Sequence, residues 1–210
     1  MLINRNIKLK KFDAVILLNG DIPDENSLNL YRNRKFIAVD GAANYLYRMG
    51  VVPDVIIGDL DSYKNEFEGE NIEIVYEGSQ EINDFEKALI YCIKNEYKEI
   101  LIFGINGGEL DHVLNNFSVI KKYIGLLDMI IFDNGRFGYL LREGKFEFEA
   151  GVNRLVSIIP FFNVRLQTYG LKWELNGEVL EFGVREGARN RSLGNRFSVE
   201  IKKGKAFLFV

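Results

Sequence analysis

The sequence predicts a layered α/β domain with a parallel, Rossmann-like sheet, followed by a small antiparallel β-sandwich domain. Between residues 12 and 133, short runs that are apolar throughout alternate with longer segments of helical periodicity. Strands buried on both faces, as in a parallel sheet covered by helices, have such continuous runs. After Asp133-Asn134-Gly135 the pattern changes to alternation of apolar and polar residues, which is typical of antiparallel strands. We therefore expect domains at 1–135 and 136–210.

The first domain is expected to contain six strands with three helices between them. The strands are expected at 14–18, 36–39, 55–57, 72–75, 100–103 and 129–132, and the helices at 41–49, 84–96 and 110–123. In the second helix, Phe85, Ala88, Leu89, Cys92 and Ile93 fall on one face, as in an amphipathic helix packed on a sheet. Cys92 is the sole cysteine, so we expect it to pack in the core and expect no internal disulfide.

The second domain shows alternation at 145–149, 155–159 and 197–201, with Asn-Gly, Glu-Gly and Lys-Gly pairs that favour tight turns. Because a core of this size is marginal alone, we expect the domain to pack on the first domain or on a second chain. Trp173, the sole tryptophan, is expected to fill that core, and stacking on a ligand is the alternative. Tyr169 has the same two interpretations.

Charge and hydropathy exclude some classes of function. The chain has 27 basic and 30 acidic residues, a net charge of −3 and no long basic cluster, so we expect no nucleic-acid partner. No apolar run reaches the length of a membrane span, and the first residues lack the apolar region of a signal peptide. We therefore expect a globular protein in the cytoplasm, without a membrane partner.

Asp59 and Asp61 follow a buried strand and are the most informative pair in the chain. Carboxylates at positions i and i+2 point the same way, and carboxylate oxygens are ligands that Mg²⁺ prefers. A magnesium ion would in turn bind a phosphorylated substrate. The alternative is an ordinary turn, because aspartate is a common turn residue and Gly58 would relieve strain there.

Polar residues and glycines also follow the neighbouring strands, where ligands of open α/β sheets bind. They are Asp40, Gly41 and Asn44, then Gln80 and Asp84, then Gly107, Gly108, Asp111 and His112. Several acids at one edge repel one another unless a cation neutralises them, which favours a shared metal site. Separately, Asp84 is also explained as a helix cap and His112 as a capping or packing residue. The glycines precede a helix N-terminus, which favours phosphate, although no Walker A or Gly-x-Gly-x-x-Gly motif is present.

Five motifs in order resemble those of the thiamine pyrophosphokinase family. They are Asp40-Gly-Ala-Ala-Asn44, Pro53-Asp-Val-Ile-Ile-Gly-Asp59-Leu-Asp61-Ser62, Asn83-Asp84-Phe-Glu86-Lys-Ala-Leu89, Gly107-Gly108-Glu-Leu-Asp111-His112 and Gly170-Leu-Lys-Trp173. The resemblance extends from about residue 13 to the C-terminus. It implies transfer of the pyrophosphoryl group of ATP to the hydroxyl of thiamine, with Mg²⁺, giving thiamine diphosphate and AMP.

By position, the resemblance implies that Asp40, Asp59, Asp61 and Asp84 hold metal and phosphates, with Asn44 and Gln80 close by. Asp111 would lie by the substrate, and either Asp111 or Asp84 would accept the hydroxyl proton. The implied binding residues also include Gly41, Asn83, Gly107, Gly108, His112 and Asn190. Domain 1–135 would bind ATP and Mg²⁺. Domain 136–210 would bind thiamine and form a homodimer, with the active site at the subunit interface.

Three positions depart from the family pattern. Glu109 replaces an arginine, Asn83 replaces a threonine, and Arg189-Asn190-Arg191 stands where many members have Ser-Asn-Glu to hold the thiamine pyrimidine. We hypothesise that Arg189 or Arg191 supplies the charge missing at position 109. Two other functions remain open from the sequence: a different Mg²⁺-dependent nucleotide phosphohydrolase, and a non-catalytic thiamine or nucleotide sensor.

Overall fold

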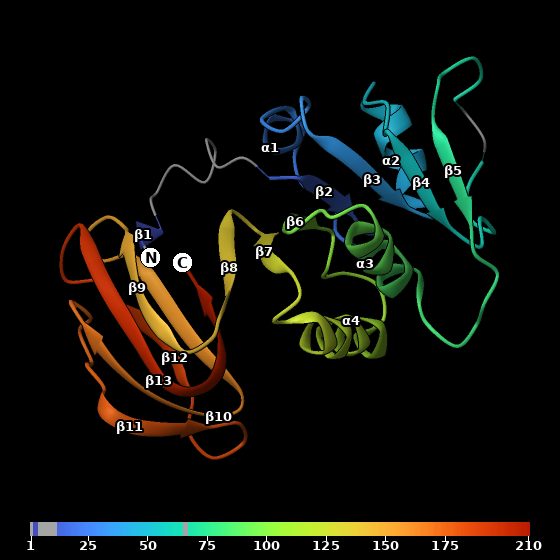
Figure 1. The fold of residues 1–210 in the computed structure, drawn as a ribbon. Helices are drawn as coiled ribbons and strands as arrows, with labels where there is room; N and C mark the ends of the chain where they lie inside the picture. The colour runs from blue at the N-terminus through green and yellow to red at the C-terminus, as the bar shows by residue number, and fades with distance from the viewer. Residues whose placement is uncertain (1, 4–11, 65–66) are drawn as a thin grey trace. The chain divides into compact units, whose positions relative to one another are not determined.

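A computed structural model of the chain describes residues 2–3, 12–64 and 67–210, which fall into two compact units (Figure 1). Residues 12–64 and 67–135 form an α/β unit, and Arg136–Val210 together with Leu2–Ile3 form a β unit. Strand β1 (Leu2–Ile3) pairs in parallel with β9 (Gly144–Glu149). Leu2 and Ile3 thus belong to the β unit, whereas the expected bounds 1–135 placed them in the α/β domain. Residues 4–11, where we expected no signal peptide, lie outside the described residues.

The α/β unit is built on a parallel sheet with strand order β7-β6-β2-β3-β4-β5. Its strands are β2 (Ala14–Leu17), β3 (Lys35–Val39), β4 (Val55–Gly58), β5 (Glu73–Tyr76), β6 (Glu99–Phe103) and β7 (Asp128–Asp133). The middle strands β2 and β4 are buried along their whole length, which explains their uninterrupted apolar runs. Because every strand runs the same way, the residues that follow the strands gather at one edge.

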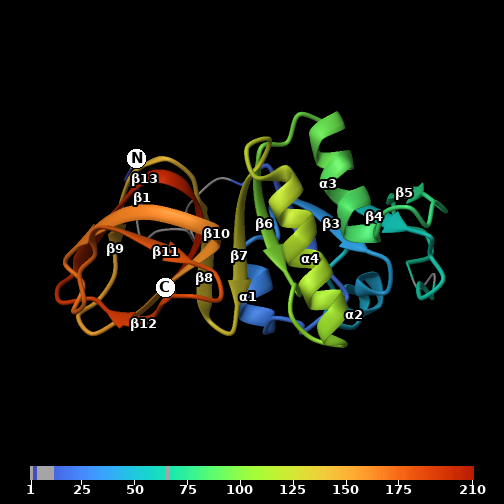
Figure 2. The ribbon, with the colours of Figure 1, turned by 90° about the horizontal axis from the view of Figure 1, so that it is seen from below.

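Helices cover both faces of this sheet: α3 (Asp84–Lys94) and α4 (Leu110–Tyr123) lie on one face, and α1 (Glu25–Asn29) and α2 (Ala42–Arg48) on the other (Figures 1 and 2). The three expected helices are present. The short α1 was not expected, because a five-residue helix gives no clear periodicity. None of the helices in the described ranges is long and apolar enough to cross a membrane.

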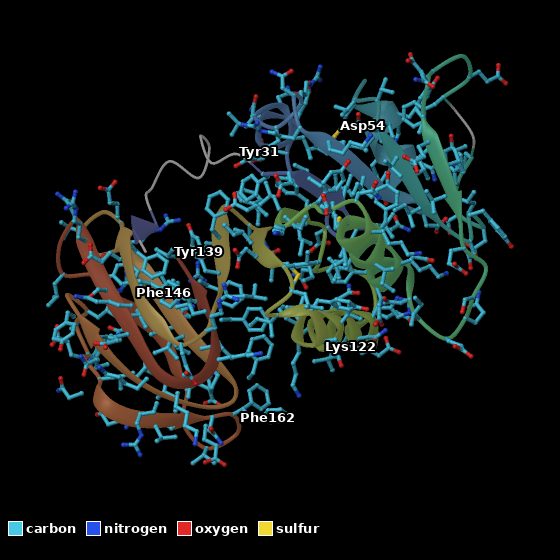
Figure 3. The ribbon with its side chains drawn as sticks, in the orientation of Figure 1. Tyr31, Asp54, Lys122, Tyr139, Phe146 and Phe162 are labelled. Carbon is cyan, nitrogen blue, oxygen red and sulfur yellow. The ribbon has the colours of Figure 1, made fainter. Side chains whose placement is uncertain are left out.

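Glu86 joins α3 to α4. Its carboxylate is buried and accepts hydrogen bonds from Lys122 Nζ and Tyr123 Oη, each at 2.8 Å; Lys122 is labelled in Figure 3. Burial, followed by the bond to Glu86, raises the pKa of the Tyr123 hydroxyl to about 12. A buried carboxylate with two donors thus fixes the last turn of α4 against the first turn of α3.

The β unit contains β8 (Arg136–Leu141), β9, β10 (Leu155–Tyr169), β11 (Asn176–Glu181), β12 (Gly187–Arg191) and β13 (Arg196–Phe209). β13 pairs antiparallel with β8, β9 and β10, and β10 pairs antiparallel with β11 and β12. The register of β10 and β13 shifts at two places, which bends these long strands around a buried apolar core. A parallel α/β domain followed by an antiparallel β domain confirms the predicted fold class.

Candidate active site

Three carboxylates meet at the carboxyl edge of the parallel sheet. Asp40 directly follows β3, and Asp59 and Asp61 follow β4, the neighbouring strand. One oxygen from each lies within 4.8 Å of the other two. Asp40 and Leu60 have positive φ angles of 47° and 63°, so the chain turns sharply after both strands. We call Asp40, Asp59 and Asp61 the acid cluster.

Asp40 is the buried member of the acid cluster. The residue is 8% exposed, and its Oδ1 has no hydrogen-bond partner among the residues that the structure describes. Burial raises the pKa of this carboxyl, because the charged form loses water. An unpaired carboxylate oxygen in such a place is costly unless a cation or donor satisfies it. The donor set therefore fits a hard divalent cation.

Asp59 accepts two hydrogen bonds at the edge of the acid cluster. Its Oδ1 accepts from the Asp61 backbone N–H at 3.3 Å, and its Oδ2 accepts from Gln80 Nε2 at 3.2 Å. The Asp61 N–H, followed by the Gln80 amide, holds the pKa of the Asp59 carboxyl below its usual value. Gln80, one of the residues we expected near phosphates, thus lies directly beside the acid cluster.

Asp84 lies next to the acid cluster but outside the set of three. A Cβ on Gly58 would lie 3.1 Å from Asp40 Cβ and 3.5 Å from Asp84 Cγ, so both side chains flank this glycine. Asp84 Oδ1 accepts a hydrogen bond from Lys87 Nζ at 2.8 Å. Lys87 also donates to the Glu77 carbonyl at 2.6 Å, and its side chain is only 4% exposed.

Lys87 is the residue of this site that sequence reasoning missed. A buried ammonium must be paired, and here its partner is a carboxylate at the edge of the acid cluster. The only signal in the sequence is a lysine three residues after Asp84, a spacing that places both side chains on one side of a helix.

A cavity of about 200 Å³ lies in the same unit, between the start of α3 and the start of α4. Its lining includes the expected Asn83, Asp84, Gly107, Gly108 and His112, together with Asn19, Gly20, Gly104, Glu109 and Asn116. Gly107 has a φ of 102°, and a Cβ there would lie 2.4 Å from Asp21 Oδ1, so only glycine fits. Glycine backbone beside a helix start lets an anion approach closely, while the carboxylates of Asp84 and Glu109 also line this cavity.

Two asparagines that we expected at the binding site have side chains that are hydrogen-bonded to backbone groups. Asn44 Nδ2 donates to the Ser62 carbonyl at 2.7 Å, and Asn44 Oδ1 accepts from the Lys64 N–H at 3.0 Å. Asn83 Oδ1 accepts from the Glu86 N–H at 2.9 Å and caps α3. Both side chains hold the elements that carry the acids. Gly41 packs closely against two other side chains, because a Cβ there would be 2.8 Å from Asn19 Nδ2 and 3.1 Å from Ser62 Cβ.

Asp111 is not brought to the acid cluster. One ligand atom of Asp111 lies within 4.8 Å of the corresponding atoms of Glu109 and His112, and all three residues are exposed. Asp111 Oδ1 accepts from the His112 N–H at 2.9 Å, and Asp111 does not line the cavity described above. Of the two acids expected to accept a proton, Asp84 is therefore the one that lies beside the cluster.

In the β unit, Trp173 and Asn190 differ from expectation. Trp173 is 57% exposed, so the prediction that it fills the core was wrong. Tyr169 is exposed as well, with Gln167 Nε2 donating to its hydroxyl at 2.8 Å. Asn190 is buried, and its amide bonds with the main chain of Trp173. A bulky ring therefore points to solvent from a segment held by a buried amide.

Both units of the chain match models of known protein families. Residues 28–128 match the family model "Thiamin pyrophosphokinase, catalytic domain", and residues 145–205 match "Thiamin pyrophosphokinase, vitamin B1 binding domain". The thiamine pyrophosphokinase of Bacillus subtilis is 28% identical over 80% of this chain and 83% of its own. Thiamine pyrophosphokinase 1 of Oryza sativa is 26% identical over 81% and 76%.

Solved structures agree in fold. The crystal structure of the Bacillus subtilis enzyme covers 93% of this chain and 97% of its own, with a TM-score of 0.81 and 23% identity. The Candida albicans structure covers 99% and 92%, with a TM-score of 0.84 and 19% identity.

Fold and matches together define an ATP-using transferase. The chain belongs to the thiamine pyrophosphokinase family, whose members transfer the pyrophosphoryl group of ATP to thiamine and form thiamine diphosphate. The two alternative functions, a phosphohydrolase and a silent sensor, are not favoured.

Replacement of Asp59 or Asp61 by asparagine should abolish turnover without unfolding the protein. Each change removes one charge from the acid cluster and keeps the size of the side chain. We expect kcat to fall at least about 100-fold, with an unchanged far-UV circular dichroism spectrum. Near-normal turnover in both variants would show that the acid cluster has no part in catalysis.

Proposed function

We propose that the acid cluster holds the Mg²⁺ that the reaction needs, with the triphosphate of ATP beside it. The observation that carries this proposal is the meeting of three carboxylates within 4.8 Å, one of them with a buried, unpartnered oxygen. Without a cation, such a site would repel a polyanion such as ATP. When bound, the ion would neutralise the charge of the phosphates and help to align them.

The surrounding residues support the acid cluster in distinct ways. Gln80 fixes Asp59, and Asn44 fixes the loop that carries Asp61 and Ser62. The glycine-lined cavity at the start of α4 is our proposed place for further phosphate contacts, which include His112. Pyrophosphoryl transfer depends on alignment and charge neutralisation more than on a covalent nucleophile, which suits a site of this kind.

We propose Asp84 as the group that orients the thiamine hydroxyl and accepts its proton. It lies beside Asp40 and lines the cavity, whereas Asp111 is grouped with Glu109 and His112. The bond from Lys87 fixes one oxygen of Asp84. A carboxylate held in this way needs little reorganisation when the hydroxyl approaches.

For thiamine, we propose that the exposed indole of Trp173 is a stacking wall. Its ring lies within the segment that matches the vitamin B1 binding model. Lys172 Nζ lies 4.7 Å from the centroid of the ring and covers one of its faces. A second cation stacked on the same ring would be disfavoured. We therefore assign the neutral aminopyrimidine of thiamine to the wall, in preference to the cationic thiazolium.

We further propose a cytoplasmic homodimer in which the α/β unit of one protomer and the β unit of its partner form each active site. Large exposed apolar side chains support an assembly, among them Leu110 and Leu114 on α4 and Phe162, Phe182 and Val184 on the β unit. Phe162 is labelled in Figure 3. Exposed apolar groups of this size are typical of surfaces that are covered by a partner.

The metal proposal predicts a specific effect of Asp40→Asn. Purified wild-type protein with ATP, thiamine and Mg²⁺ should give AMP and thiamine diphosphate in equal amounts, and EDTA should stop both. We expect Asp40→Asn to raise the Mg²⁺ concentration for half-maximal rate about tenfold or more, because the buried oxygen loses its charge. Glu70→Gln, an exposed acid with the same change of charge, is the matched control and should leave that concentration unchanged. An unaltered Mg²⁺ requirement in Asp40→Asn would contradict the assignment.

The shared-site proposal predicts complementation between two defective variants. Asp59→Asn and Trp173→Ala proteins are mixed, allowed to exchange subunits, and assayed at a thiamine concentration well below the KM of Trp173→Ala. Random exchange should restore about a quarter of wild-type activity, since each mixed dimer has one intact site. If each site lies within one protomer, every site in the mixture is defective and no activity returns.

A further inference from the structure

Asn190 satisfies both main-chain polar groups of Trp173. Asn190 Oδ1 accepts from the Trp173 N–H at 3.1 Å, and Asn190 Nδ2 donates to the Trp173 carbonyl at 2.6 Å. The same Oδ1 accepts from the Arg191 N–H at 2.8 Å. Asn190 is only 8% exposed, so these three hydrogen bonds lie within the protein. We expected Asn190 to contact the substrate, and its surroundings assign it another task.

A β-bulge in β12 turns Asn190 inward. The pairing of β10 with β12 shifts register between Val156 and Ile158, and Arg189 has a φ of 58°. The Arg189 N–H, which the bulge removes from the regular ladder, donates to Ser157 Oγ at 3.0 Å. Bulges of this kind re-aim side chains, and a left-handed non-glycine residue is maintained only where its surroundings impose it.

Contacts of the neighbouring backbone strengthen the attachment of Trp173 to Asn190. The Lys172 N–H donates to the Arg191 carbonyl at 2.8 Å, and Leu171 forms an isolated bridge with Ser192. The main chain at 171–173 is therefore attached to the end of β12 through both backbone and side chain. The indole of Trp173, in contrast, is 57% exposed. A ring carried by a fixed backbone loses less freedom when a ligand stacks on it.

We propose that Asn190 is a positioning residue: its buried amide fixes the backbone of Trp173 and so presents the indole as a rigid wall for the thiamine ring. Asn190 acts through Trp173 and does not touch thiamine. This inference rests on the proposed stacking role of Trp173.

The sole tryptophan makes the test direct, because fluorescence excited at a wavelength that tyrosine does not absorb reports on Trp173 alone. In wild-type protein, thiamine should quench this emission at saturation. In Asn190→Asp, which keeps the size of the side chain but loses the donor to the Trp173 carbonyl, we expect a Kd for thiamine about tenfold higher. The emission anisotropy of the indole should fall, since the ring is no longer fixed. The KM for ATP should stay within about twofold of wild type.

A double-mutant cycle separates indirect from direct action of Asn190. The KM for thiamine is measured for wild type, Trp173→Ala, Asn190→Asp and the double variant. If Asn190 acts through Trp173, Asn190→Asp adds nothing once the indole is absent. If the two effects multiply, Asn190 contacts thiamine itself and our inference is overturned. If Trp173→Ala alone leaves the KM unchanged, the stacking wall fails. That outcome differs from a raised KM in Trp173→Ala with an unaffected Asn190→Asp, which refutes the positioning role only.

Asn163→Asp is the matched control, since Asn163 is an exposed asparagine on β10 with the same chemical change. It should leave the Kd for thiamine and the anisotropy unchanged. Should Asn190→Asp fail to fold, Asn190→Ser replaces it. A serine hydroxyl is too short to satisfy both groups of Trp173, so the same rise in Kd and fall in anisotropy are expected. Wild-type values of both in a folded Asn190→Ser protein would also overturn the inference.

Discussion

The structure of the site depends on the electrostatic repulsion among carboxylates at the carboxyl edge of the parallel sheet. Asp40, Asp59 and Asp61 have oxygens within 4.8 Å of one another, and Asp40 presents a buried oxygen without a partner among the described residues. Like charges at this separation raise the free energy of the folded protein unless a cation offsets them. We therefore propose that the cluster is complete only with a cation and the phosphates bound to it.

The rest of the α/β unit holds these carboxylates close together. Parallel pairing of β3 with β4 brings the two strand ends together, and Gly58 leaves room for Asp40 and Asp84 on either side. The buried ammonium of Lys87 pairs with Asp84 and gives the edge one internal positive charge. Glu86 joins the first turn of α3 to the last turn of α4 and so fixes the two helices against each other. In the β unit, a buried polar side chain likewise holds a functional segment: the amide of Asn190 bonds both main-chain groups of Trp173.

Much of this could be predicted from the sequence, because hydrophobic periodicity and strand-end chemistry are local. The buried strands, the helices α2, α3 and α4, and the meeting of Asp40 with Asp59 and Asp61 all follow from such patterns. The hydrogen-bond partners of the asparagine side chains could not be predicted. Asn44, Asn83 and Asn190 match positions of a binding motif, yet each bonds to backbone, because loop and cap geometry depend on tertiary structure. The burial of Lys87 and the exposure of Trp173 likewise depend on packing that one sequence does not reveal.

Thermal unfolding of wild-type and Asp40→Asn proteins in EDTA and in Mg²⁺ tests whether the acid cluster is unfavourable alone and is stabilised by a cation. Mg²⁺ should raise the Tm of the wild type, because it binds the folded site. In EDTA, Asp40→Asn should melt at a temperature equal to or higher than the wild type, since one buried charge is gone, and Mg²⁺ should then change its Tm little. A lower Tm for Asp40→Asn in EDTA, together with an equal response of both proteins to Mg²⁺, would contradict the account.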